Sequence, residues 1–436
     1  MSPVLLVVLA PFAVGLVVWA IVDLERYLMF AVLTSIVFPA SLGKPGGANI
    51  AAADVLLLLA LVSWLINNAV GNAPDPMVRG SKLILAGVAF AAIQAVSLIW
   101  TTNPHRTLQF SIQAFELFVI FPAVFASLPR SVRIVEKGLI LFLGATAVLA
   151  VALLFVYATN PTARQAGTYL PGMGKNPAGS YEAFGLVIGY ALFLLRPRLR
   201  WLLVLVVLLD AGGLVASASR GAMLGAAAGI FVVSLIMRRG AAAAAMAMLI
   251  LVAAYFVVIA PGEAAKTAHA GAYSSASLRL QLWGAALHTI HLHPFLGVGA
   301  GAYYDFRNGQ SDPNNTLLRT WAETGILGLL ALMYLLFVYS QMVARWRRHP
   351  DRYAAALAAA CAGVFMVQFM HSEVDVSWVR GLGSMMFASL GMTIALERLT
   401  EHETAPAIDP ATTEAVPARA APGDERLRAR IGMSSE

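Results

Sequence analysis

The stretch GLILFLGATAVLAVALLFVYATNPTA, residues 138–163, contains no charged side chain and decides the fold. A run of about 20 apolar residues is long enough to cross the hydrocarbon core of a bilayer. Because lipid offers the backbone no hydrogen-bond partner, such a run must form a helix. Residues 1–22 form a second uncharged run, and a polar turn at residues 23–26 leads directly into further apolar sequence. The sequence therefore predicts an integral membrane protein whose first helix is retained.

The composition of the whole chain agrees with this interpretation. The 436 residues are 59% hydrophobic and only 12% charged, which is about half the charged fraction usual in soluble proteins. The net charge of +7 does not indicate nucleic acid, because arginines in the loops set the orientation of membrane proteins. We expect membrane lipids, and no nucleic acid, as partners. The single cysteine, Cys361, excludes an intrachain disulfide.

Apolar runs along the chain predict an all-α, polytopic fold with twelve or thirteen transmembrane helices. The expected helices are 3–22, 27–43, 52–70, 82–101, 107–128, 134–158, 181–196, 199–217, 221–237, 240–260, 316–344, 353–371 and 379–397. Residues 1–397 would form the transmembrane domain. Residues 398–436 lack apolar periodicity, so we expect a disordered tail there.

Basic residues fall in alternate short loops, which places them on one side of the membrane. The clusters are Arg130/Arg133/Lys137, Arg196/Arg198/Arg200, Arg238/Arg239 and Arg345/Arg347/Arg348/Arg352. By the positive-inside rule that side is the cytoplasm, and the C-terminal tail would lie there too. The long segment 261–315 is then extracytoplasmic, and Ser277 to Ile290 has the pattern of an amphipathic helix within it. An outward-facing active site is expected in this loop.

Four motifs follow one another between Ser219 and Gly325. They are Ser219-Arg220-Gly221, Arg279-x-x-x-Trp283, His293-Pro294-x-x-Gly297-x-Gly299 and Asn315-x-x-Leu318 with Ala322-Glu323-x-Gly325. In this order the set resembles the O-antigen ligase-like family of membrane glycosyltransferases, which includes O-antigen polymerases. Weaker matches precede it at Asn103-Pro104 and at residues 172–177.

The resemblance implies a GT-C-like enzyme that takes a glycan from undecaprenyl pyrophosphate and uses no nucleotide sugar, cofactor or obligatory metal. It assigns Arg220 and Arg279 to the pyrophosphate. Arginine suits this role because its guanidinium fork matches phosphate oxygens and stays charged. Snorkelling to the interface, or a surface charge on the loop helix, is the alternative for these two arginines. Arg319 is a third candidate, for which the alternative is an ion pair with Glu323 at i, i+4.

One position departs from the family pattern. Asn314 occupies the place where the ligase branch has a histidine that is thought to activate the acceptor hydroxyl. An amide cannot accept a proton at neutral pH, so Asn314 would orient a hydroxyl rather than deprotonate it. Asp312 and Glu323 are the candidate bases, and the outer loops add Asp305, His371, Glu373 and Asp375. Asn314 and Asn315 have helix N-capping as an alternative role.

Further side chains of the outer loop are candidates for contact with the acceptor or with sugar rings. These are Asn315, Tyr303 and Trp321, although aromatic side chains also gather at the membrane interface. Three loop histidines lack the fixed carboxylate or cysteine partner of a typical zinc site. They are His288, His291 and His293. We therefore expect no metal.

The function that the sequence predicts is transfer of a lipid-linked glycan to a sugar acceptor at the outer face of a bacterial inner membrane. Asn314 favours polymerisation of polysaccharide repeat units over ligation to lipid A-core. Protein O-oligosaccharyltransferases of the same superfamily are another alternative. From a different class, a transporter or flippase for lipid-linked oligosaccharides would place charges in the middle of the membrane and show internal repeats. We find no repeat, and the charges gather at the interfaces.

Overall fold

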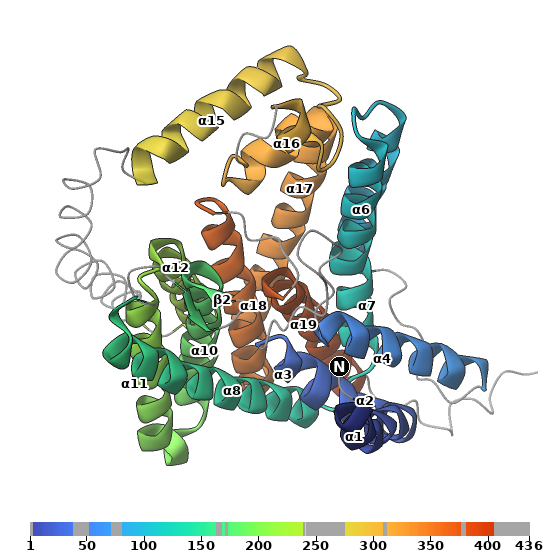
Figure 1. Ribbon diagram of the computed structural model, residues 1–436. Helices are drawn as coiled ribbons and strands as arrows, with labels where there is room; N and C mark the ends of the chain where they lie inside the picture. The colour runs from blue at the N-terminus through green and yellow to red at the C-terminus, as the bar shows by residue number, and fades with distance from the viewer. Residues whose placement is uncertain are drawn as a thin grey trace, which may run out of the picture. The chain divides into compact units, whose positions relative to one another are not determined.

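The computed structural model describes residues 3–37, 52–70, 81–162, 168–170, 173–238, 240, 275–307, 312–375 and 381–404. The chain divides into a unit of Met1–Leu399 and a unit of Thr400–Glu436. Nearly all described elements of the first unit are helices (Figure 1). The predicted all-α fold is confirmed, with the addition of a short antiparallel pair of strands, β1 (Thr168–Leu170) and β2 (Met173–Gly174).

Helices in the first part of the chain are interrupted at several points. They are α1 (Pro3–Val22), α2 (Leu24–Arg26), the π-helix η1 (Tyr27–Val32), α3 (Leu33–Ser35), α4 (Ala52–Ala69), α5 (Lys82–Val96), the 3-10 turn η2 (Ser97–Ile99), α6 (Pro104–Phe115), the π-helix η3 (Glu116–Ile120), α7 (Phe121–Ser127) and α8 (Val132–Thr159). The helix expected from residue 107 begins earlier, at Pro104, because the Asn103 side chain caps it by accepting the Arg106 N–H.

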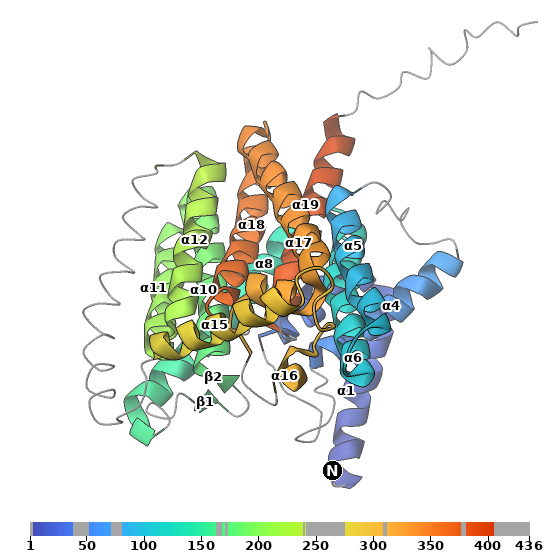
Figure 2. The same cartoon turned by 90° about the horizontal axis from the view of Figure 1, so that it is seen from above.

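The second part of the chain builds the helices that surround the candidate site. They are α10 (Lys175–Leu195), the turn η4 (Pro197–Leu199), α11 (Arg200–Ser217), α12 (Arg220–Met237), α15 (Ser275–Leu292), α16 (Tyr303–Phe306), α17 (Thr316–Arg348), α18 (Arg352–Ser372) and α19 (Leu382–Thr404). The sequence predicts the first of these from residue 181, but α10 begins at Lys175. The predicted loop helix is present as α15, and it runs across α12, α18 and α17 rather than alongside them (Figure 2).

Within the described part of the chain, eight helices are long and apolar enough to cross a membrane. They are Lys82–Ile99, Pro104–Ser127, Val132–Thr159, Lys175–Leu195, Pro197–Ser217, Arg220–Met237, Thr316–Arg348 and Arg352–Ser372. Two shorter apolar helices, Phe12–Val22 and Ala53–Asn67, accompany them. A multi-pass membrane protein is thereby confirmed. The helix expected at 240–260 lies outside the described residues, and α19, expected as a span, is not among the eight.

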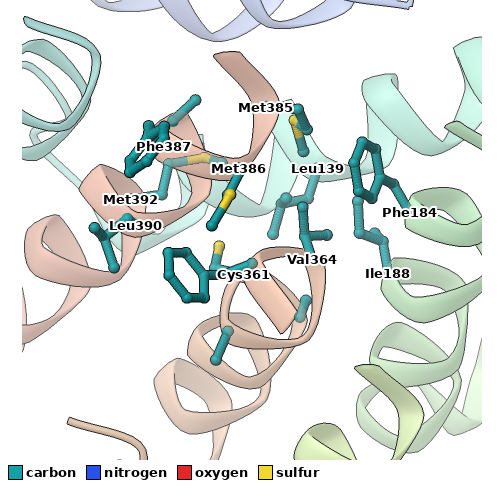
Figure 3. Packing of buried hydrophobic residues seen from close by; sticks show 14 of the residues in the cluster. Leu139, Phe184, Ile188, Cys361, Val364, Met385, Met386, Phe387, Leu390 and Met392 are labelled. Atoms are coloured by element: carbon teal, nitrogen blue, oxygen red, sulfur yellow. The ribbon is translucent and has the colours of Figure 1, made fainter. Parts of the chain in front are cut away.

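The hydrophobic core lies where α18 packs against α8, α10, α12 and α19. Figure 3 shows Phe184 and Ile188 of α10 near Leu139 of α8, with Cys361 of α18 beside Met386 of α19. Residues 354–362 of α18 are almost all alanine and are at most 1% exposed. Small side chains let helices approach closely, which favours their association within a membrane. Close packing of α18 therefore fixes the position of its C-terminal end.

Two carboxyl side chains lie in the middle of spans. Glu182 of α10 and Asp210 of α11 have no exposed surface, and Thr146 Oγ1 of α8 lies 3.5 Å from Asp210 Oδ2. Glycines on the facing helices leave room for them, since a Cβ at Gly213 would lie 2.8 Å from Glu182 Cδ and one at Gly185 would overlap Asp210. The expectation that charges gather at the interfaces is wrong at these two positions. Glycines on the neighbouring helices leave space for a carboxyl side chain inside the helix bundle.

Helix α17 is broken at Gly325, where φ is 66° and ψ is −165°. Hydrocarbon would leave the backbone groups at such a break unsatisfied, but the loop after α15 supplies partners. Three backbone hydrogen bonds join the segments: Val298 N–H to the Ala322 carbonyl (3.0 Å), Gly299 N–H to the Glu323 carbonyl (2.8 Å) and Ile326 N–H to the Pro294 carbonyl (3.0 Å). Residues 294–299 and 322–326 thus form a loop–helix clasp, which contains parts of two of the four motifs.

We expect Gly325→Ala to break this clasp. A Cβ at this position would overlap the Phe295 carbonyl oxygen, and the positive φ disfavours any residue with a side chain. The variant should lose about 2 kcal/mol or more of stability and melt several degrees below the wild type, as measured by intrinsic fluorescence in detergent. Gly144→Ala is the control, because a Cβ there meets nothing within 4 Å. Equal melting temperatures for Gly325→Ala and the wild type would contradict the clasp.

Candidate functional site

A cavity of about 340 Å³ opens where the first turns of α10 and α12 meet α15 and the end of α18. Its lining residues are Lys175, Asn176, Ala218, Arg220, Gly221, Arg279, His371 and Asp375. Arg220 and Arg279, which the sequence assigns to one ligand, therefore line one cavity although they come from different elements. The lining holds three cationic side chains and one carboxylate, so we term it the cationic cavity.

Two helices begin at the cationic cavity. Lys175 is the first residue of α10, and Arg220 is the first residue of α12. Ser219 caps α12, because its side chain accepts a hydrogen bond from the Ala222 N–H. The remaining N–H groups at a helix start carry partial positive charge and bind anions. The two helix ends therefore add to the positive potential of the side chains.

A chain of polar side chains holds Asp375 in the wall of the cavity. Ser219 Oγ donates to Asn176 Oδ1 over 3.1 Å, and Asn176 Nδ2 donates to Asp375 Oδ2. On the other side, His371 Nε2 lies 3.7 Å from Asp375 Oδ2. The ring of His371 is itself held at Nδ1, which is 2.5 Å from Ser180 Oγ. Asp375 is thereby fixed between α10 and α18.

Close packing explains the glycine of the Ser-Arg-Gly motif. A Cβ at Gly221 would overlap the imidazole ring of His371, so only glycine lets α12 approach the end of α18. Across the cavity, Arg279 Nε is buried and has no hydrogen-bond partner. A buried donor without a partner destabilises a protein unless a ligand satisfies it. Arg279 therefore keeps a donor for an anion.

Arg319 is engaged differently from the other two arginines. Its Nη1 lies 2.9 Å from Asp312 Oδ2, and its Nε lies 3.1 Å from Glu323 Oε1. The guanidinium also lies 4.9 Å from the centre of the Phe110 ring. The ion pair with Glu323 that the sequence offers as an alternative is present, with a second carboxylate in addition. All four side chains, together with Asp375, line a second cavity of about 600 Å³, which we term the acidic cavity.

Asn314 and Asn315, at the position where the sequence departs from the family pattern, lie at the start of α17. Asn315 is the N-cap, since its Oδ1 accepts the Leu318 N–H over 2.8 Å, and its Nδ2 donates to the Glu373 carbonyl over 3.1 Å. The capping alternative is therefore confirmed for Asn315. Asn314 has a φ of 52°, a conformation that asparagine tolerates better than most residues. A backbone role accounts for the residue type at this position.

The aromatic candidates Tyr303 and Trp321 pack in a small core beneath α15. Tyr303 is only 2% exposed, and Trp321 Nε1 donates to the Pro294 carbonyl over 3.1 Å. Neither side chain lines the cationic or the acidic cavity. Of the loop histidines, His293 packs edge-on against Phe306 at 5.3 Å. In the described ranges no three His, Cys, Asp or Glu side chains gather into a group that could hold a metal.

Four polar residues of the cationic cavity are not among those that the sequence predicts for the pyrophosphate. Lys175 and Asn176 belong to the weak match at residues 172–177, which was the available signal for them. His371 and Asp375 are among the outer-loop side chains that the sequence offers as replacements for the absent histidine. Their meeting in one cavity depends on the packing of α10, α12 and α18, which no local pattern reveals.

The fold and the site define the class of protein: a multi-pass membrane protein with a cation-lined cavity at one end of its helices. Residues 203–333 match a sequence model of the family described as O-antigen ligase. The resemblance to an O-antigen ligase-like family is thereby confirmed, and it supports a general role in transferring a lipid-linked glycan to a glycan acceptor. No curated protein matches the chain. The matched range contains all four motifs, whereas Lys175 and Asp375 lie outside it.

Beside the site, burial raises the pKa of Glu373 to about 7 from its usual 4.5. A carboxyl whose pKa rises on folding destabilises the fold once it ionises, so stability should fall as the pH rises from 4.5 to 7. At pH 8 Glu373→Gln should therefore be more stable than the wild type by up to about 3 kcal/mol and melt at a higher temperature. Near pH 4.5 the two should melt at the same temperature. Exposed Glu401→Gln is the control. Parallel pH profiles for Glu373→Gln and the wild type would rule out this explanation.

Proposed function

We propose that this protein transfers a glycan from an undecaprenyl-pyrophosphate carrier to a hydroxyl of a glycan acceptor at the outer face of a bacterial inner membrane. The observation that carries the proposal is the convergence of Lys175, Arg220 and Arg279, from three separate elements, on one cavity. A pyrophosphate diester carries two negative charges, and three cations match them. The guanidinium fork of arginine also matches two oxygens of a phosphate group, which favours a phosphate over an uncharged ligand.

Charge on the leaving group is the main barrier that such a site must lower. As the bond between the anomeric carbon and the phosphate oxygen breaks, the departing lipid pyrophosphate takes the bonding electrons and gains a further negative charge. Preorganised donors aimed at developing charge usually provide the largest single contribution to catalysis. Arg220, Arg279 and the N-terminal ends of α10 and α12 are such donors.

We assign the proton of the acceptor hydroxyl to Asp375 rather than to Asp312 or Glu323. In the proposed step the hydroxyl oxygen bonds to the anomeric carbon, and its proton moves to the carboxylate. Asp312 and Glu323 line only the acidic cavity, whereas Asp375 lines both cavities. A base at the boundary of two cavities can meet an acceptor on one side and a donor on the other.

The position of the site along the helices supports the outward orientation. Helices α10, α12 and α17 begin at or near the cavities, and the basic residues Arg196, Arg238 and Arg348 lie at their opposite ends. By the positive-inside rule the opposite end is cytoplasmic. Polymerisation of repeat units stays the favoured reaction, because Asn314 cannot act as the histidine of the ligase branch does.

A transporter of lipid-linked sugars is the second candidate, and one observation favours it. Glu182 and Asp210 are buried in the middle of spans, and ionisable groups at such depth often mark transport pathways. The cationic cavity lies at the helix starts instead, and neither carboxyl lines it. The transferase is therefore the better account of the arginines.

We expect Arg220→Ala and Arg279→Ala each to lower kcat for glycan transfer about 100-fold or more. The measurement is chain lengthening with release of undecaprenyl pyrophosphate, using purified protein in vesicles with a lipid-linked repeat unit. Arg279→Lys keeps the charge without the fork and should retain an intermediate rate. Exposed Arg198→Ala, at the other end of the helices, is the control. Wild-type turnover in Arg279→Ala, or movement of the lipid across vesicles without bond formation, would exclude the transferase.

The orientation can be tested separately, because the single natural cysteine, Cys361, is fully buried. A cysteine placed at exposed His288 of α15 should react in intact cells with a membrane-impermeant maleimide. A cysteine placed at exposed Arg198 should react only after the membrane is opened. The reverse pattern would place the cavities on the cytoplasmic side.

A further inference from the structure

The acidic cavity lies between α5 and α6 on one side and the start of α17 on the other. Its lining includes Phe90, Gln94, Phe110, Gln113, Arg319 and Asp375. It holds about 600 Å³ of space between atoms and is open to solvent on one side. The cationic cavity accounts for none of these residues except Asp375.

The charge of the acidic cavity excludes the ligand of the cationic one. Three carboxylates and one arginine line it, and the guanidinium of Arg319 is held by Asp312 and Glu323. Carboxylates already outnumber cations here, so a phosphate would be repelled. A hydroxyl group is uncharged, so it can donate a hydrogen bond to a carboxylate oxygen without this repulsion. The ligand that fits is uncharged and carries several hydroxyls.

The remaining wall combines amides with aromatic rings. Gln94 and Gln113 face the cavity from α5 and α6, and each amide has both a donor and an acceptor for a hydroxyl group. Phe90 and Phe118 form an apolar back wall with ring centres 4.5 Å apart, and Phe110 lines the cavity nearer α17. A sugar ring has hydroxyls around its edge and apolar C–H faces, so this wall suits it.

We propose that the acidic cavity binds a sugar ring of a glycan at the point of bond formation, with Gln113 and Phe110 as its specificity-determining residues. This inference rests on the proposed function and adds the saccharide site to the pyrophosphate site. Asp375 lines both cavities, so a ring held here presents a hydroxyl or an anomeric carbon next to the pyrophosphate. The ring belongs either to the acceptor or to the donor glycan, and the kinetics distinguish the two.

The test removes the hydrogen-bonding amide and keeps the shape of the side chain. Gln113→Leu should raise the KM of one glycan substrate about fivefold to tenfold, because one or two hydrogen bonds to hydroxyls are lost. Gln109→Leu on the same helix is the matched control, since Gln109 is exposed and lies outside the cavity lining. Phe110→Ala with exposed Phe115→Ala forms a second pair on α6. Melting temperatures establish that each variant folds.

Two outcomes of the kinetics support the proposal, and one overturns it. A rise in the KM of the acceptor alone identifies the ring as the acceptor's, and a rise in the KM of the donor alone identifies it as the donor's. Unchanged KM values for both substrates in folded Gln113→Leu and Phe110→Ala overturn the proposal. The control variants should match the wild type in every measurement.

A binding measurement separates this proposal from the proposed function. Saturation-transfer NMR on the purified protein would use free glucose, galactose, N-acetylglucosamine and rhamnose as probes. We expect a signal from at least one sugar in the wild type and in Arg279→Ala, and its loss in Gln113→Leu. Retention of sugar binding without any transfer activity would remove the proposed function and leave the saccharide site. Equal signals in the wild type and Gln113→Leu, or no signal from any sugar in the wild type, would remove the site.

Discussion

A break in a helix that crosses a membrane is tolerated only where protein supplies the hydrogen bonds that lipid cannot. In this protein the break is at Gly325, and residues 294–299 supply the partners through the clasp. The clasp follows α15 directly in the chain, so the same three hydrogen bonds that satisfy α17 also anchor the end of α15. Through α15 they set the position of Arg279 at the cationic cavity. One backbone arrangement thereby connects the walls of both cavities.

The two cavities differ in charge because different side chains line them. The first residues of α10 and α12 contribute Lys175 and Arg220 to the cationic cavity, whereas the acidic cavity contains Glu323 from α17 and Asp312 from the segment before it. Charges in a low-dielectric, partly buried setting interact strongly. An anionic group is therefore drawn to one cavity and kept from the other. That separation orients a substrate that is anionic at one end and hydroxyl-rich at the other.

The sequence predicts the helices well where lipid alone dictates them, as in α8 (Val132–Thr159), because an uncharged run has one possible structure there. It also brings Arg220 and Arg279 together, because each stands in an ordered motif. It does not mark the start of α10, since Lys175 and Asn176 are polar and hydropathy favours residue 181 instead. The sequence also does not predict the directions in which side chains point. Residue type does not reveal that Tyr303 points into a small core, nor that Asp312 joins Glu323 on Arg319.

A carboxylate is a weaker base than the histidine that the ligase branch has at the position of Asn314. A reaction that depends on such a base must draw more of its rate from departure of the leaving group than from activation of the nucleophile. The leaving group then carries much of the charge in the transition state, and stabilising that charge becomes the chief task of the protein. The distribution of residues follows this requirement. Two arginines, a lysine and two helix ends gather around the cationic cavity, while a single carboxylate, Asp375, lies between it and the acidic cavity.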